Sequence, residues 1–206
     1  MDLLEELRIM DSVDGKGRKM EGWCTYEKAL ALANLVLQVK PKTVVELGVF
    51  GGRSLVAMGL GMKRMQAPGL VYGVDPWTTE AVLEGTMNEV DRIWWGQCNL
   101  GRVFGSCLEG IVNSGTAEWI RLLCCTSEQA SKQFEQDSID ILHIDSNHSE
   151  ETSTKEVHLW FPKVKRGGHI WFDDTDWPTT QKAIEMLSKW CNVVKDVKTC
   201  RLFQRT

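Results

Sequence analysis

The sequence predicts an α/β protein: a Rossmann-like, doubly wound, seven-stranded sheet that is mostly parallel, with an antiparallel edge strand. Short apolar segments rich in Val, Ile and Leu alternate along the chain with longer segments of helical periodicity. Strands separated by helices need crossover connections, which make neighbouring strands parallel and cover both faces of the sheet. Residues 192–205 form two strand-like segments around a turn at Lys198 and Thr199, which predicts the antiparallel edge.

Local signals predict the individual elements. Thr25 can cap a helix that Pro41 ends, so a helix is expected at residues 25–39. Further helices are expected after the glycine-rich turn at 51–54 and at 127–135, 150–164 and 178–191. The first five strands are expected at 43–49, 70–75, 119–125, 139–145 and 169–174.

The chain of 206 residues is expected to form a single domain at residues 23–206, preceded by a polar lead-in or flap at residues 1–22. Residues 78–117 are more than a simple connection between two strands requires. A crossover helix at about 100–113 accounts for part of this segment. The remainder, with the adjacent Trp94 and Trp95, is expected to form a lid or a wall of the substrate site.

Composition narrows the class of protein. The net charge of −4 and the lack of a basic surface make a nucleic-acid partner unlikely on electrostatic grounds. Seven cysteines without a C-x-x-C pair or a secretory leader fit a reducing cytoplasm. No apolar run approaches the roughly 20 residues that span a bilayer, so no membrane insertion is expected. The sequence leaves a homo-oligomer open.

The first two strands end in residues typical of a nucleotide site. Gly48, Gly51 and Gly52 follow the first strand and permit a tight turn with close backbone approach. Asp75 follows the second strand, where its carboxylate could bind a ribose diol. Phe50 stands where a dinucleotide fingerprint requires its second glycine, so a cofactor without a pyrophosphate is favoured.

The fourth and fifth strands end in acids. Asp145 closes the fourth strand, and Asp173 and Asp174 close the fifth, at ends that neighbouring strands would bring to about 5 Å apart. Three crowded carboxylates would repel one another unless a divalent cation such as Mg²⁺ lay between them. His148, one turn beyond Asp145, could take a proton from a bound hydroxyl. The alternative is that these acids only cap helices at the strand ends.

Four segments resemble, in their order and spacing, class I S-adenosylmethionine-dependent methyltransferases: VVELGVFGGRS, VYGVDPW, ILHIDSNHSEE and RGGHIWFDDTDW. The resemblance is to the metal-dependent O-methyltransferase group that includes macrolide-sugar methyltransferases and cephalosporin-hydroxylase-like proteins. It covers about residues 21–184, nearly the whole chain.

The resemblance implies S-adenosylmethionine as the cofactor. In that family the glycine-rich turn holds the methionine part, the acid after the second strand holds the ribose, and the residues after it cover the adenine. The implied cofactor-binding residues are Glu46, Gly48, Gly52, Ser54, Asp75, Pro76, Trp77, Ser127 and Asp145. The adenine-edge segment departs from the family, which commonly has an acid where this chain reads CTSE.

The implied activity is Mg²⁺-dependent methylation of a hydroxyl on a small molecule. Asp145, Asp173 and Asp174 would hold the metal, and Asp145 and His148 would be catalytic, with His148 as the general base. One alternative is a cofactor-binding module without catalysis, because a fold does not guarantee chemistry. The other is a nucleic-acid acceptor, for which the chain lacks both a basic groove and an Asn-Pro-Pro-Tyr type motif.

Overall fold

A seven-stranded sheet organises the chain in the computed structural model, which describes residues 2–13, 16–66 and 68–206. The strands are β1 (Thr43–Leu47), β2 (Leu70–Val74), β3 (Ile120–Leu123), β4 (Ile139–Ile144), β5 (Val164–Phe172), β6 (Cys191–Val197) and β7 (Cys200–Arg205). Their order is β3-β2-β1-β4-β5-β7-β6. Strands β1 to β5 pair in parallel, whereas β7 pairs antiparallel with β5 and with β6. The predicted fold is confirmed, and the antiparallel strand β7 lies inside the outermost strand β6.

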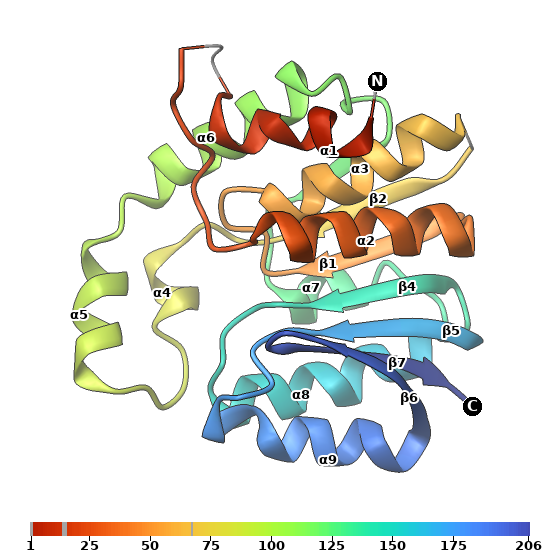
Figure 1. The fold of residues 1–206 in the computed structure, drawn as a ribbon. Coiled ribbons are helices and arrows are strands. Elements are labelled where there is room, and N and C mark those ends of the chain that lie inside the picture. The colour runs from red at the N-terminus through yellow and green to blue at the C-terminus, as the bar shows by residue number, and fades with distance from the viewer. Residues whose placement is uncertain (1, 14–15, 67) are drawn as a thin grey trace.

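Helices cover both faces of the sheet (Figure 1). One layer holds α1 (Leu3–Glu6), η1 (Leu7–Asp11), α2 (Tyr26–Val39), α3 (Arg53–Met65) and α6 (Leu100–Asn113). The other holds α7 (Ser127–Ser131), α8 (Glu150–Trp160) and α9 (Gln181–Trp190), with the short turns η2 (Phe161–Lys163) and η3 (Pro178–Thr180). Each layer has its own buried apolar cluster against the sheet. Helix α7 ends at Ser131 rather than at residue 135, and β5 begins before the expected residue 169.

The N-terminal segment packs into the core, which corrects the expected surface lead-in. Leu3, Leu7 and Met10 are buried with Val13 and Met20 in the cluster beneath α2 and α3. The spacing of Leu3, Leu7 and Met10 is helical, but polar and glycine residues around it obscure this signal. In addition, the Arg53 guanidinium donates hydrogen bonds to the carbonyls of Met10 and Met20.

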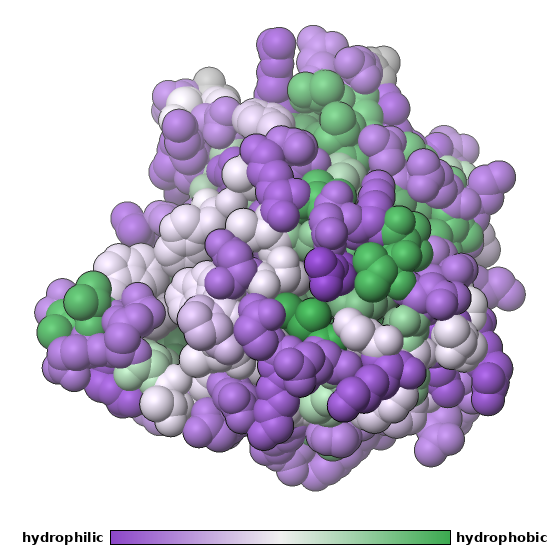
Figure 2. Space-filling view, turned by 60° about the horizontal axis from the view of Figure 1, so that its bottom comes forward, coloured by the Kyte–Doolittle hydropathy of each residue, from purple (hydrophilic) through white to green (hydrophobic). Residues whose placement is uncertain are grey.

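Residues 78–99 project beyond the sheet. They contain α4 (Thr79–Val82) and α5 (Glu89–Gln97), neither of which has a buried residue (Figure 1). Helix α6 lies where the crossover helix was predicted and packs on α3. On the face drawn in Figure 2, hydrophobic residues form small separate patches among hydrophilic ones. Among the described residues, no helix has the length and apolarity needed to cross a membrane.

Candidate active site

A cavity of about 900 Å³ lies at the carboxyl ends of the parallel strands. Its walls come from the turns after β1, β2, β4 and β5, the start of α7, and residues 81–95 of the projecting segment. This is where open α/β sheets bind ligands, and the volume suits a small molecule. Of the predicted site residues, the walls include Gly48, Ser54, Asp75, Pro76, Ser127, Asp145, His148, Asp173 and Asp174.

Glu46, Gly52 and Trp77 are not among the residues that line the cavity. Glu46 is fully buried beneath it and accepts hydrogen bonds from the hydroxyl of Ser54 and, at 2.9 Å, from Nδ1 of His143. The Trp77 ring packs on Phe104, and its Nε1 donates to the Phe50 carbonyl at 2.9 Å. Glu46 and Trp77 thus hold the turn after β1 and its helix in place. Their direct contact with the cofactor stays a prediction.

Gly48 is required by close packing between two strand ends. Its φ is +79°, and a Cβ at this position would lie 2.2 Å from the carbonyl oxygen of Asp145. Any side chain would therefore push the turn after β1 away from the end of β4. The glycine holds the predicted cofactor turn directly against the acid that was predicted to be catalytic.

Asp75 holds the same turn from the β2 side. Its Oδ2 accepts backbone N–H bonds from Val49 at 3.0 Å and Phe50 at 2.9 Å, and its Oδ1 accepts one from Trp77 at 2.7 Å. A carboxylate offers about four acceptor positions, so one remains on Oδ1. Asp75 therefore keeps acceptor capacity for a ribose hydroxyl, and its binding of the ribose stays a prediction.

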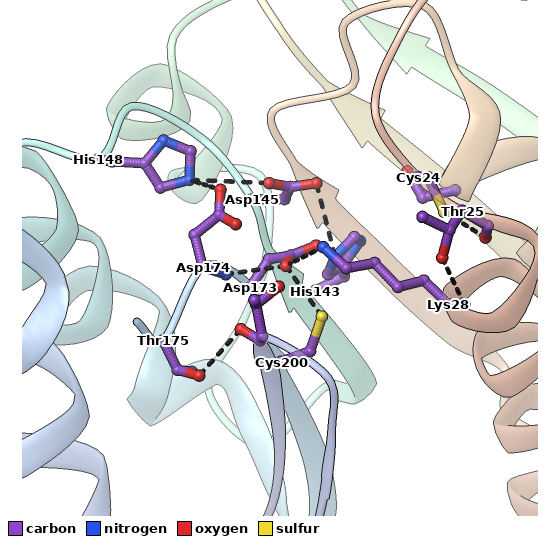
Figure 3. Close-up of polar contacts among 12 residues, drawn as sticks. Cys24, Thr25, Lys28, His143, Asp145, His148, Asp173, Asp174, Thr175 and Cys200 are labelled. Atoms are coloured by element: carbon purple, nitrogen blue, oxygen red, sulfur yellow. Dashed lines mark hydrogen bonds and ion pairs between the residues drawn. The ribbon is translucent and has the colours of Figure 1, made fainter. Parts of the chain in front are cut away.

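The three acids predicted as one metal site form two overlapping groups that share Asp145: one also holds Asp173 with His143, and the other holds Asp174 with His148 (Figure 3). Consecutive residues Asp173 and Asp174 present their carboxylates to different partners, and Asp174 has a φ of +48°. Asp173 lies deeper, with His143 and Lys28. We call Lys28, His143 and Asp173 the inner cluster, and Asp145, His148 and Asp174 the outer cluster.

The inner cluster contains its own cation. Nζ of Lys28, on the first turn of α2, lies 2.6 Å from Oδ1 of Asp173, with both side chains largely buried. Burial alone would lower the pKa of Lys28, but the adjacent Asp173 carboxylate raises it above its usual value. Burial would likewise lower the pKa of His143, but the nearby carboxylates of Asp173 and Glu46 raise it to about 10. Asp173 is thus already compensated, with a pKa held below its usual range.

The outer cluster lacks such compensation. Nε2 of His148 lies 3.0 Å from Oδ2 of Asp174 and 3.8 Å from Oδ1 of Asp145, yet it has no hydrogen-bond partner among the described residues. Burial and the neighbouring charge of Asp173 raise the pKa of Asp145 to about 8. Burial lowers the pKa of His148, but Asp174 more than offsets this, so the pKa is raised. Three potential ligand atoms lie within 4.8 Å of one another here.

An aromatic cluster stands at the mouth of the cavity. Trp23 stacks on Phe50 with ring centroids 5.0 Å apart, and Trp94 and Trp95 of α5 contact both rings. Trp23 is 64% exposed and Trp94 is 46% exposed, so large apolar area faces the opening. The cluster joins three distant segments of the chain, which supports the predicted role of residues 78–117 as a wall or lid.

Lys28 is a site residue that sequence reasoning missed. Lys28 occupies a helix position that normally carries a solvated charge, and nothing local identifies a partner 145 residues away. The available signal was indirect: three acids at two strand ends require positive charge from elsewhere.

Comparison with known proteins identifies the class. Residues 45–175 match the family model described as a methyltransferase domain. The chain therefore belongs to the methyltransferase domain family. None of the curated proteins compared with the chain matches it.

Solved structures share the fold. The O-methyltransferase NovP is 17% identical with a TM-score of 0.73, over 99% of this chain and 98% of that one. An O-methyltransferase from Bacillus cereus in complex with SAH (S-adenosylhomocysteine) is 13% identical with a TM-score of 0.65, over 100% of this chain and 92% of the other. The SAH-bound Podospora anserina methyltransferase PaMTH1 is 13% identical with a TM-score of 0.67, over 100% of this chain and 88% of the other. The predicted class I methyltransferase fold is confirmed.

Proposed function

We propose that the protein transfers the methyl group of S-adenosylmethionine to a hydroxyl oxygen of a small molecule, beside a divalent cation bound by the outer cluster. The observation that carries this proposal is the position of Asp145. Its carboxylate belongs to the outer cluster, and its backbone touches the cofactor turn at Gly48. An acceptor held by the outer cluster would therefore lie next to the methionine end of the cofactor.

The outer cluster fits a divalent cation. The raised pKa of Asp145 and the unpartnered Nε2 of His148 both reflect a site that is short of compensating charge. Asp145 and Asp174 would each offer a carboxylate oxygen to such a cation, which suits Mg²⁺. His148 would lie beside the ion rather than bind it, because its Nε2 must stay free to accept a proton. Lys28 occupies Oδ1 of Asp173, but Oδ2 lies toward His143 and Asp145, so the role of Asp173 as a ligand stays a prediction. Such a cation lowers the pKa of a hydroxyl and orients it.

The chain's own residues would then carry the proton and the alignment. In the transfer, the acceptor oxygen forms a bond to the methyl carbon while the bond from that carbon to sulfur breaks, and the hydroxyl proton must leave. His148 is the predicted acceptor of that proton, and it must be neutral to take it. Asp174 raises the pKa of His148, whereas a cation bound beside the ring would lower it and favour the neutral form. The role of His148 as a base therefore depends on a bound cation.

The acceptor is proposed to be a small molecule, and the setting a reducing cytoplasm. The net charge of −4 supports the first point, and seven free cysteines support the second. The exposed rings of the aromatic cluster offer the acceptor an apolar wall close to the polar outer cluster. A homo-oligomeric state stays a prediction.

The proposal is tested by a methyl-transfer assay on a panel of hydroxylated small molecules, paired with the same molecules lacking the hydroxyl. The expected result is an O-methylated product that is lost with chelator and restored by Mg²⁺ or Mn²⁺. Methyl transfer at full rate in excess chelator would refute the requirement for a divalent cation. Binding of SAH without transfer to any of the paired acceptors would favour a cofactor-binding module.

A further inference from the structure

Glu156 is a buried carboxylate of the cavity to which methyl transfer at the outer cluster assigns no role. It lies on α8, is 2% exposed and lines the cavity. Its Oε2 accepts a hydrogen bond from the hydroxyl of Ser146, and the hydroxyl of Ser127 donates a second bond to the carboxylate. Ser146 follows β4 and Ser127 opens α7 after β3, so this carboxylate lies between two strand ends.

Compensation of this carboxylate by basic side chains is weak, and the charge of His148 lowers its pKa only in part. Within the described ranges no Lys or Arg forms an ion pair with Glu156, and the neighbouring Lys155 pairs with Glu128 at 2.6 Å. Burial raises the pKa of Glu156 to about 7, and the two serine hydroxyls offset only part of this effect. Burying a carboxylate with two neutral partners is costly. A ligand that brought a further N–H donor would reduce that cost.

The position of Glu156 matches the purine end of a bound nucleoside. Asp75 offers its remaining acceptor position to a ribose at the end of β2, and β3 is the neighbour of β2 at the edge of the sheet. A base that extends from this ribose toward β3 meets the start of α7, where Ser127 hydrogen-bonds to Glu156. Pro76, just after Asp75, also lines the cavity.

The β3 segment itself offers no buried acid for this base. Its sequence after the strand is CTSE, and the acid of that segment, Glu128, is half exposed and paired with Lys155. Glu128 and Glu156 both line the cavity, but the buried carboxylate is that of Glu156 on α8. Adenine presents two N–H donors on its exocyclic amino group, which a carboxylate accepts well.

We infer that Glu156 accepts a hydrogen bond from the exocyclic amino group of the cofactor's adenine, so that the buried acid for the base comes from α8 while Glu128 of the β3 segment stays paired with Lys155. The inference rests on the proposed cofactor site but not on the acceptor, the cation or the base. It also predicts base selectivity, because a 6-oxo group would place an acceptor oxygen against the carboxylate.

The test compares SAH with its analogue that lacks the 6-amino group, by calorimetry on the full-length protein. The wild type should bind the analogue about 10- to 100-fold more weakly, the range for a hydrogen bond to a charged group. In Glu156→Gln, whose side chain has the same shape, SAH should bind more weakly and the ratio between the ligands should shrink to a few-fold. Glu150→Gln is the matched control, because Glu150 lies on the same helix but is exposed and pairs with Lys182; it should keep the wild-type ratio.

Equal affinity of the wild type for the two ligands would overturn the inference even if the Glu156 variant failed to fold. An unchanged ratio in a folded Glu156→Gln protein would also overturn it and leave Glu156 a purely structural partner of the two serines. A protein that does not bind SAH at all would instead contradict the cofactor site on which the proposed function depends. The two failures are therefore distinguishable.

Discussion

Replacing Lys28 with Met should destabilise the protein severely, although Lys28 lies on an ordinary amphipathic helix. Lys28 and Asp173 have side chains that are 12% and 6% exposed, and Nζ lies 2.6 Å from Oδ1. Removing one partner of a buried pair leaves the other charge uncompensated, which typically costs 3–5 kcal/mol. Because other groups also contact Asp173, including Sγ of Cys200 at 2.9 Å and the backbone N–H of Asp174 at 2.8 Å, we expect about 3 kcal/mol.

The assay is urea unfolding of the two single variants and the double variant Lys28→Met/Asp173→Asn at pH 7. The double variant should be more stable than Lys28→Met alone, because the Asp173→Asn change leaves no buried charge without a partner. The cost of Lys28→Met should also shrink toward acid pH. In the wild type the folded-state pKa of Asp173 is depressed, so ionised Asp173 stabilises the protein above its unfolded-state pKa, and this stabilisation is lost as pH falls through the folded-state pKa. Without Lys28 the carboxylate of Asp173 should take up its proton at a higher pH, which removes the uncompensated charge.

Lys182→Met is the matched control because Lys182 pairs with Glu150 on the surface, where exposed ion pairs contribute little. It should unfold close to the wild type. If Lys28→Met costs no more than this control, or if the double variant is less stable than both singles, the buried pair is not the compensation for Asp173 that the geometry indicates.

Four further outcomes are expected. Asp174→Asn should lose Mn²⁺ binding, measured by calorimetry, while SAH affinity stays near that of the wild type; unchanged Mn²⁺ binding would contradict the outer cluster as the cation site. His148→Ala should slow methyl transfer by roughly 10²- to 10⁴-fold, with partial recovery at higher pH as the acceptor ionises unaided, and a loss that is flat with pH would argue against a base. Residues 93–105 should exchange backbone hydrogens more slowly when cofactor and acceptor are both bound, whereas equal exchange in free and bound protein would indicate a rigid wall. Glu156→Gln should remove a pH dependence of the free energy of unfolding. Because folding raises the pKa of Glu156 from 4.5 to about 7, the wild type should lose about 3 kcal/mol of stability relative to the variant as pH rises through that range. Parallel curves of unfolding free energy against pH for the two proteins, measured with denaturant, would contradict this.

The fold could be predicted from the sequence because its signals are local and repeated. Alternating strand and helix periodicity predicted the parallel sheet, and the Lys198 turn predicted the antiparallel strand pairing. The N-terminal segment could not be assigned in this way. Its apolar residues are few, and their burial depends on a groove that α2 and α3 create only after folding.

The candidate site was predictable as a location but not as a set of contacts. Strand ends placed Asp145 and both aspartates after β5 at one edge of the sheet. The carboxylates of Asp173 and Asp174 point to different partners because Asp174 has a left-handed backbone conformation. An aspartate can adopt this conformation but does not require it, so the sequence does not predict it. The cation of the inner cluster comes from a helix at the other end of the chain, so its pairing with Asp173 is a long-range property.

The most direct test of the account is a crystal structure of the protein with SAH and Mn²⁺, with the ion located by its anomalous signal. We predict SAH across the ends of β1 and β2, with its adenine beside Glu156 and its sulfur toward Asp145. The ion should lie on the carboxylates of Asp145 and Asp174 with His148 next to it, while Lys28 remains on Asp173. An ion bound by Asp173 with Lys28 displaced, or a cavity without SAH at saturating concentration, would contradict the account.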